Sequence, residues 1–307
     1  MFKNLIVYRI GAGWAPAVTD IEAALDKAPF VPCGATQPAS SGWVSPRGVV
    51  HGPLVESVGG QWLLQLMVEQ RVLPGAVVKR RIDEIAAQIE HSTGRKPGKK
   101  QKKEIKEDVL LELLPQAFTK QASIRVWIAP AAQLLMIDAS SPARADDVVS
   151  LLVKAIDGLA LAPLHTAQSA AAAMAEWLTS GEPPAGFSVD RECELKSSDE
   201  MKSVVRYARH PLDTEEVRQH IAAGKLPTKL ALTWQSRVSL LLTDTMQIKK
   251  IAFLDVVFEG RSAASRDEGF DADAAIATGE LVQLLPDLID ALGGEQVPGA
   301  MPLALAA

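Results

Sequence analysis

The acidic side chains most closely spaced for metal chemistry lie in one short run near the carboxyl end, DEGFDAD. Carboxylate oxygens bind divalent cations, and a cation held there could support metal-dependent hydrolysis of nucleic acid. The alternative is that Asp271 and Asp273 cap the last helix, whose N-terminal dipole favours negative charge. Because no lysine or further acid stands at a helpful spacing, we favour capping and keep a metal-dependent nuclease as the alternative. The metal-binding carboxylates of such a nuclease would be Asp267, Glu268, Asp271 and Asp273.

Other motifs that could carry chemistry are incomplete. Gly11-Ala12-Gly13 follows an expected strand, but Pro16 occupies the place of the third glycine in a dinucleotide-binding loop. Neither a phosphate-binding P-loop nor a nucleophile elbow is present. Cys33 and Cys193 are far apart and without metal-ligand spacing, so we expect two buried, reduced thiols. The sequence therefore predicts no active site, no metal and no cofactor.

The clearest signal is a segregation of charge. The chain has a formal net charge of −5, yet residues 79–106 contain ten Lys or Arg and only four Asp or Glu, a local charge of +6. A concentrated positive surface on an acidic protein can attract a polyanion. The basic side chains of this segment that we expect to contact DNA are Lys79, Arg80, Arg81, Lys99, Lys100, Lys102 and Lys103.

A second basic group is spread over the carboxyl-terminal part of the chain. Few aromatic residues accompany it, which argues against stacking platforms for single strands. Contacts to phosphate carry no sequence information, so binding through these residues would be nonspecific. A protein-interaction module whose basic segment docks an acidic partner is the other alternative. The candidates in this group are Arg206, Arg209, His210, Lys225 and Lys229.

The elements expected to position these residues indicate an α+β fold. Apolar residues recur every three or four positions within 75–114, which predicts two helices broken near Gly94 and Pro97, a protruding helical hairpin. Alternation at Leu230, Leu232 and Trp234 predicts a strand in an antiparallel meander. Further strands are expected at 4–10, 43–50, 62–68, 123–128 and 133–138, and further helices at 17–28, 144–156, 213–224 and 273–292.

Several ordered segments together resemble one family, the recombination-associated protein RdgC. They are FKNLIVYRI, FVPCG, GWVSPRG, VLPGAVVKR, LLPQAF, LDTEEVRQHIAAGKLPTKLALTW, FDADAAIATGEL and LLPDLIDALGGE, and they cover nearly the whole chain. The resemblance implies a ring-shaped homodimer that encircles double-stranded DNA without sequence preference, with single-stranded DNA bound more weakly. It also implies nucleoid association and competition with the RecA recombinase for DNA.

The same resemblance assigns roles to individual residues. Phe118, in LLPQAF, corresponds to the family's dimer-interface phenylalanine, and Arg209 and His210 to an exposed pair that faces the DNA. His210-Pro211 departs from the polar residues of the family, which puts the contribution of His210 in doubt. The implied subunit is elongated and multi-lobed: a central domain of residues 1–74 and 115–163, a tip of residues 75–114 and a base of residues 164–307. With no signal peptide and no apolar run long enough to cross a membrane, we expect a cytoplasmic protein.

Overall fold

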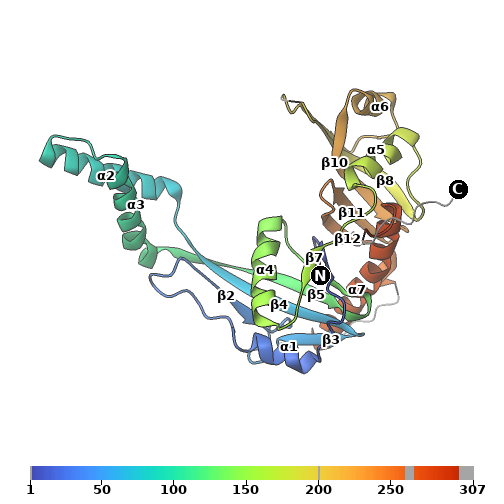
Figure 1. The fold of residues 1–307 in the computed structure, drawn as a ribbon, viewed down its shortest axis with the longest axis horizontal. Helices are drawn as coiled ribbons and strands as arrows, with labels where there is room; N and C mark the ends of the chain where they lie inside the picture. Colours follow the sequence, from blue (N-terminus) through green and yellow to red (C-terminus); the bar gives the residue numbers. More distant parts are fainter. Residues whose placement is uncertain (1, 200, 260–265, 297–307) are drawn as a thin grey trace.

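The computed structural model describes residues 2–199, 201–259 and 266–296, with the side chains of 266–268 left out. Two antiparallel sheets are surrounded by helices, so the predicted α+β class is confirmed (Figure 1). The larger sheet has the strand order β2-β4-β5-β6-β1-β7, with β3 paired to β4. Its strands are β1 (Ile6–Ile10), β2 (Ala39–Val44), β3 (Val55–Val58), β4 (Gln61–Val72), β5 (Phe118–Ala129), β6 (Leu134–Ile137) and β7 (Leu161–Pro163).

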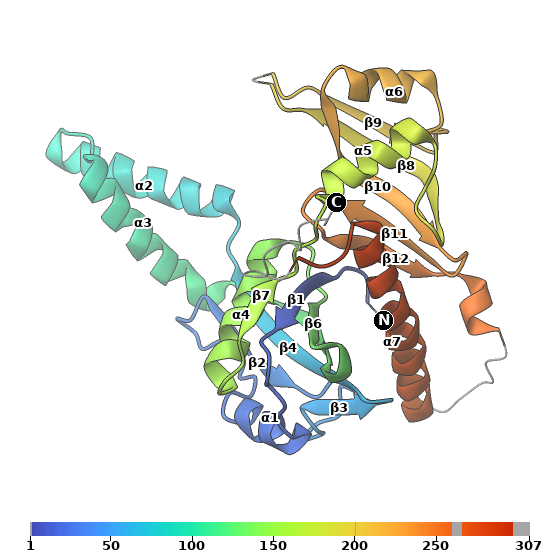
Figure 2. The ribbon, with the colours of Figure 1, turned by 45° about the vertical axis from the view of Figure 1, so that its right-hand side comes forward.

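The long strands β4 and β5 pair along their whole length, from Trp62 opposite Ile128 to Val72 opposite Phe118. The chain between them therefore leaves and re-enters the sheet at the same end of one two-stranded ribbon. That intervening chain forms α2 (Gly75–Thr93) and α3 (Lys99–Leu113), followed by a short 3₁₀ turn at Leu114–Gln116. The ribbon carries this helical pair away from the rest of the chain (Figures 1 and 2).

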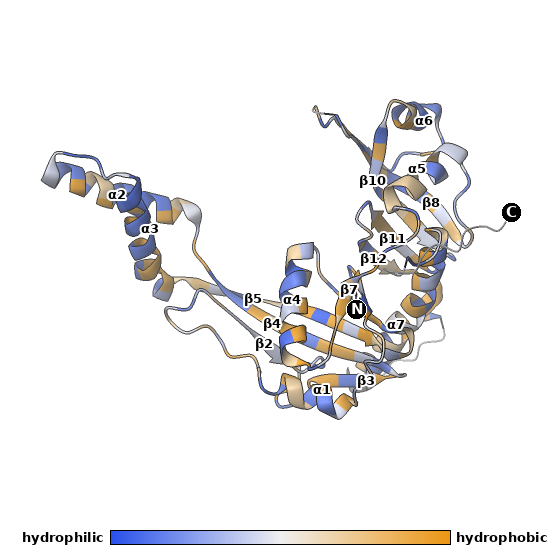
Figure 3. Cartoon of the chain, viewed as in Figure 1, coloured by the Kyte–Doolittle hydropathy of each residue, from blue (hydrophilic) through white to orange (hydrophobic). Residues whose placement is uncertain are grey.

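The helices α2 and α3 share a small apolar core of their own. Val78 of α2 and Ile105 and Val109 of α3 are buried there, and Ile82, Ile85 and Ile89 pack against them. Gly94 ends α2 with a φ of 70°, a left-handed conformation that glycine adopts without a steric penalty. Apart from this stripe the two helices are mostly hydrophilic (Figure 3). The predicted pair of helices with a break near Gly94 is thus present, within one residue of its expected ends.

The second sheet has the order β12-β11-β10-β8-β9. Leu230, Leu232 and Trp234 of β10 are all buried, so the predicted alternation is confirmed, as is the meander of the last three strands. Two of the neighbouring helices begin at hydroxyl caps, because Ser169 accepts from the amide of Ala172 and Thr214 from that of Val217. The elements are α5 (Ala170–Ser180), β8 (Phe187–Ser197), β9 (Val204–Ala208), α6 (Glu215–Ala222), β10 (Lys225–Trp234), β11 (Val238–Thr243) and β12 (Ile248–Phe253).

Two large cores hold these layers together. The helices α1 (Val18–Leu25) and α4 (Pro142–Ala155) cover one face of the larger sheet through residues such as Ile21 and Val148. The opposite face, including Trp127, joins a continuous core with the second sheet and the last helix, α7 (Arg266–Ala291). Residues just before β1 also extend the second sheet, since Leu5 and Ile248 exchange both backbone hydrogen bonds. The first strand segment therefore joins the two sheets.

The last helix differs from the sequence prediction. It begins at Arg266 and runs through Pro286 to Ala291, whereas we expected a start at residue 273. Asp271 and Asp273 consequently lie inside the helix, and the prediction that they cap it is wrong. Asp271 instead forms an ion pair with Arg47, with 2.6 Å between Oδ1 and Nη2. Cys193 is buried as expected, but Cys33 is only partly buried.

Candidate nucleic-acid interface

The basic residues of α3 lie on one side of the helix. Lys99, Lys102, Lys103 and Lys106 are all exposed and follow one another at intervals of three, one and three, which places them in a single stripe. Three acidic residues of the same helix, Glu104, Asp108 and Glu112, lie on the other exposed side, whereas Glu107 lies one turn after Lys103, beside the stripe. Within the described chain, an ion pair is recorded for only one lysine of the stripe, Lys103 with Glu107 at 3.8 Å. This stripe is a positive surface that a row of phosphates could contact.

The predicted basic residues of α2 differ in their contacts to other side chains. Lys79 and Arg80 are exposed, and Arg80 makes only a long contact of 3.8 Å to Glu84. Arg81 reaches across to α3, where its Nη2 lies 2.9 Å from Oε1 of Glu112. The hydrogen bond that Arg81 donates to Glu112, followed by the one to Glu84, raises the pKa of Arg81. Arg81 therefore holds the two helices together, a role that its sequence position did not indicate.

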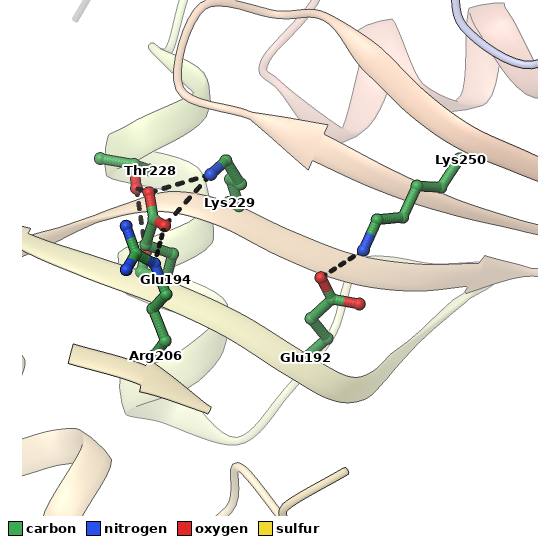
Figure 4. A network of polar contacts seen from close by, with 6 residues as sticks. All are labelled: Glu192, Glu194, Arg206, Thr228, Lys229 and Lys250. Atoms are coloured by element: carbon green, nitrogen blue, oxygen red, sulfur yellow. Dashed lines mark hydrogen bonds and ion pairs between the residues drawn. The ribbon is translucent and has the colours of Figure 1, made fainter. Parts of the chain in front are cut away.

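On the second sheet, two predicted DNA contacts converge on one carboxylate. Arg206 and Lys229 are the direct cross-strand neighbours of Glu194, on β9 and β10 respectively. Arg206 Nε lies 2.6 Å from Glu194 Oε2, and Lys229 Nζ lies 3.1 Å from both carboxylate oxygens (Figure 4). Hydrogen bonds led by that of Arg206 lower the pKa of Glu194 to about 2. Sequence reasoning missed Glu194, because these contacts depend on strand register alone.

The remaining basic candidates lie near the ends of β9 and α6. Arg209 is exposed, with a left-handed φ of 56°. His210 is also exposed, but its Nδ1 lies 2.7 Å from the carbonyl oxygen of Pro211, and its ring packs at a tilt against that of Tyr207, with 5.4 Å between the ring centres. Lys225 Nζ lies 3.4 Å from Nδ1 of His220. Of Arg209, His210 and Lys225, Arg209 is therefore the residue best placed to contact a phosphate.

One chain does not bring its two basic groups together. Figures 1 and 2 place α2 and α3 at one end of the molecule and the second sheet at the other, with the larger sheet between them. Phe118 lies at the root of the helical pair, where β5 begins, and its side chain is 88% exposed. Because aromatic side chains are enriched in protein interfaces, this exposed ring could pack against a partner.

The carboxylate run considered for metal binding is only partly described. The side chains of Asp267 and Glu268 lie outside the described residues, while Asp271 is paired with Arg47. No group of three or more potential metal ligands is found in the described ranges. Across those same ranges, no helix is both long and apolar enough to cross a membrane.

Comparison with known proteins gives a consistent result over the whole chain. A family model described as "Putative exonuclease, RdgC" matches residues 1–295. The recombination-associated protein RdgC of Dechloromonas aromatica (strain RCB) is 48% identical over 301 residues, which cover 96% of this chain and 98% of the relative. The proteins of the same description from Cupriavidus necator and Bordetella pertussis are 50% and 45% identical over 297 residues, covering 96% of this chain and 99% of each relative.

Proposed function

Because the chain belongs to the RdgC family of recombination-associated proteins, we propose that it binds double-stranded DNA without sequence preference as a ring-shaped homodimer. By occupying duplex in the nucleoid, it limits the access of the RecA recombinase. The α2–α3 pair acts as a protruding helical hairpin, the tip of a three-part subunit with a central and a base domain. Single strands are bound more weakly, since the basic surfaces lack aromatic residues on which bases could stack.

The observation that carries this proposal is the lysine stripe of α3. Four exposed ammonium groups lie on one side of the helix, with Glu107 alone of the helix's acidic residues beside them, and such a cluster of positive charge can neutralise backbone phosphates. Contacts of these lysines to phosphate would carry no sequence information, which accords with nonspecific binding. Lys79, Arg80, Lys100 and Arg209 add exposed positive charge.

A homodimer explains how two separated basic groups could act on one ligand. A twofold axis doubles each basic surface and can direct the copies toward a common centre. Phe118 is our candidate for an anchor between subunits, because it lies where the α2–α3 pair, here called the arm, joins the larger sheet, with almost its whole side chain in solvent. A closed ring would keep DNA bound topologically, so that modest contacts suffice.

Salt titration of duplex binding tests the proposal. Affinity for unrelated 30-base-pair duplexes should be equal, and should fall by about 10³-fold or more between about 50 and 200 mM salt if six or more phosphates are contacted. The variant Lys102→Ala/Lys103→Ala should reduce the magnitude of the salt slope by about 4, because the dimer loses two lysines from each subunit. Lys27→Ala, at an exposed lysine beside α1, is the control and should change nothing. A strong preference for one duplex, or a flat salt response, would overturn the proposal.

The same preparation separates a clamp from a nuclease, the activity in the family model's description. Linearised plasmid, which has ends that an exonuclease could attack, should remain intact when incubated with the protein and Mg²⁺ or Mn²⁺ if the protein only binds. Cleavage that disappears on chelation, and in Asp271→Ala, would support the nuclease instead.

A further inference from the structure

The second sheet packs one face against the core that includes α5 and α7, and its other face carries several charged residues. Cys193 and Leu195 of β8 are buried in the core that includes α5 and α7, so the alternating residues Glu192 and Glu194 project from the opposite face. This opposite face carries the basic residues Arg206, Lys229 and Lys250, each bonded to one of those two carboxylates (Figure 4). Positive charge on this sheet is therefore balanced locally by acid.

Glu194 is held far more tightly than an ordinary surface carboxylate. Its side chain is only 14% exposed, and besides the two cations it accepts a hydrogen bond of 2.8 Å from Thr228 Oγ1. Arg206, in contrast, is 72% exposed, so its guanidinium lies at the surface while its Nε is bonded to Glu194. With a pKa near 2, the carboxylate is ionised at any pH at which DNA binding is measured.

We propose that Glu194 is an internal competitor for phosphate that restrains Arg206 and Lys229 and so limits the strength of duplex binding at the second sheet. This inference rests on the proposed function. A carboxylate that bonds an arginine and a lysine occupies the donors that a phosphate would use. The three groups together carry +1 instead of the +2 that the two cations would present. A phosphate must displace an anion already in place, which keeps the contact weak and readily exchanged.

A neighbouring ion pair provides a matched control. Glu192 lies on the same strand and face and contacts only Lys250, at 2.6 Å, in a pair whose side chains are 44% and 63% exposed. Glu192→Gln removes the same charge from the same face. Exposed pairs of this kind are weak and screened by salt, so Lys250 is already largely available to a ligand.

The test is fluorescence anisotropy of the full-length protein with a labelled duplex, for wild type, Glu194→Gln and Glu192→Gln. Glu194→Gln should tighten binding about 60-fold at about 0.1 M salt and steepen the salt slope by about 2, the effect of one more phosphate contact in each subunit of the dimer. Glu192→Gln should have less than half of that effect on the logarithm of affinity. Arg206→Ala should weaken binding more in the Glu194→Gln background than in wild type.

Unchanged or weakened binding by Glu194→Gln would overturn the inference, because Glu194 would then position the two cations for DNA. An equal effect of both substitutions would also overturn it, since only the general charge of the face would matter. If Glu194→Gln does not fold by circular dichroism, Glu194→Asp withdraws the carboxylate by one methylene and should tighten binding by a smaller factor. Failure of wild type to bind any duplex is a different result, and it refutes the proposed function itself.

Discussion

Arg71 donates a hydrogen bond from its Nη1 to the carbonyl oxygen of Ala117, 3.2 Å away, one residue before the exposed Phe118. The same nitrogen lies 3.1 Å from the carbonyl oxygen of Leu114, at the end of α3. The guanidinium also reaches the carbonyl oxygens of Cys33 and Gly34. One side chain of β4 therefore joins a surface loop to the junction between the arm and the sheet.

Arg71→Ala should loosen this junction without unfolding the protein. The carbonyl groups near Leu114 and Ala117 would lose a charged donor, a change of about 1.5–3 kcal/mol for hydrogen bonds of this type. Amide exchange of residues 114–118 should become about tenfold faster or more, while the global unfolding midpoint falls only slightly. Arg80→Ala, at an exposed arginine of α2, is the control. Exchange rates equal to those of wild type would show that Arg71 does not fix the junction.

Phe118→Ala should weaken the homodimer and leave the folded subunit intact. The ring is almost fully solvent-exposed in one chain, so its removal should change the free energy of subunit unfolding by less than about 0.5 kcal/mol. A buried aromatic anchor at an interface contributes about 2 kcal/mol or more, so the dimer should dissociate at least about 30-fold more readily. Sedimentation velocity over a dilution series measures this, with Val153→Ala, an exposed position on α4, as the control. An identical dissociation constant for Phe118→Ala would exclude Phe118 as the anchor.

Arg47→Met should destabilise the attachment of α7 to the larger sheet. Arg47 bonds Glu56, a carboxylate only 11% exposed, at 2.8 Å and lies 4.6 Å from the centre of the Phe270 ring. Its loss leaves Glu56 without its guanidinium in a poorly solvated place, which should cost about 2–3 kcal/mol in urea unfolding. Lys103→Met breaks an exposed pair and should cost less than about 0.5 kcal/mol. Similar losses for the two variants would contradict this account.

The ion cluster on the second sheet predicts a specific pH dependence of stability. The pKa of Glu194 is lowered from 4.5 to about 2, so its ionised form is favoured by folding. The stabilisation is complete above pH of about 4.5 and is lost as the pH falls toward about 2. Wild type should therefore exceed Glu194→Gln in free energy of unfolding at pH 7, and the difference should shrink steadily below pH 4.5. A difference that stays constant from pH 7 to pH 3 would show that the carboxylate is not the stabilising group.

Local patterns sufficed to predict much of the fold. The stripe of Val78, Ile82, Ile85 and Ile89 specifies a helix whatever its surroundings, because side chains at that spacing share one face. Alternation of apolar and polar residues in β10 specifies a strand with one buried face, because successive side chains of a strand point to opposite faces of the sheet. The start of α7 was not predictable, since the glycine and carboxylates before Asp273 favour a loop locally. Burial of apolar residues along α7 and the pair between Asp271 and Arg47 accompany a helix there.

The candidate interface was predictable in composition but not in detail. Charge counts locate the basic segment, and helix periodicity orders Lys99, Lys102 and Lys103 on one side. Arg206 and Lys229 also stand out by residue type, yet nothing local indicates that Glu194 lies between them. Those three residues meet only because β9, β8 and β10 pair in one particular register. Arg71 and Ala117 likewise meet through the fold, across a 46-residue separation.

Retention on circular DNA tests the central proposal, encirclement of duplex by a closed dimer, most directly. The protein is bound to nicked circular plasmid, crosslinked between subunits, and washed in about 1 M salt, at which phosphate contacts are largely screened. We predict that the crosslinked dimer stays on the circle and is released when a single restriction cut makes the plasmid linear. Release from the intact circle in the same wash, with crosslinking confirmed on a denaturing gel, would contradict encirclement.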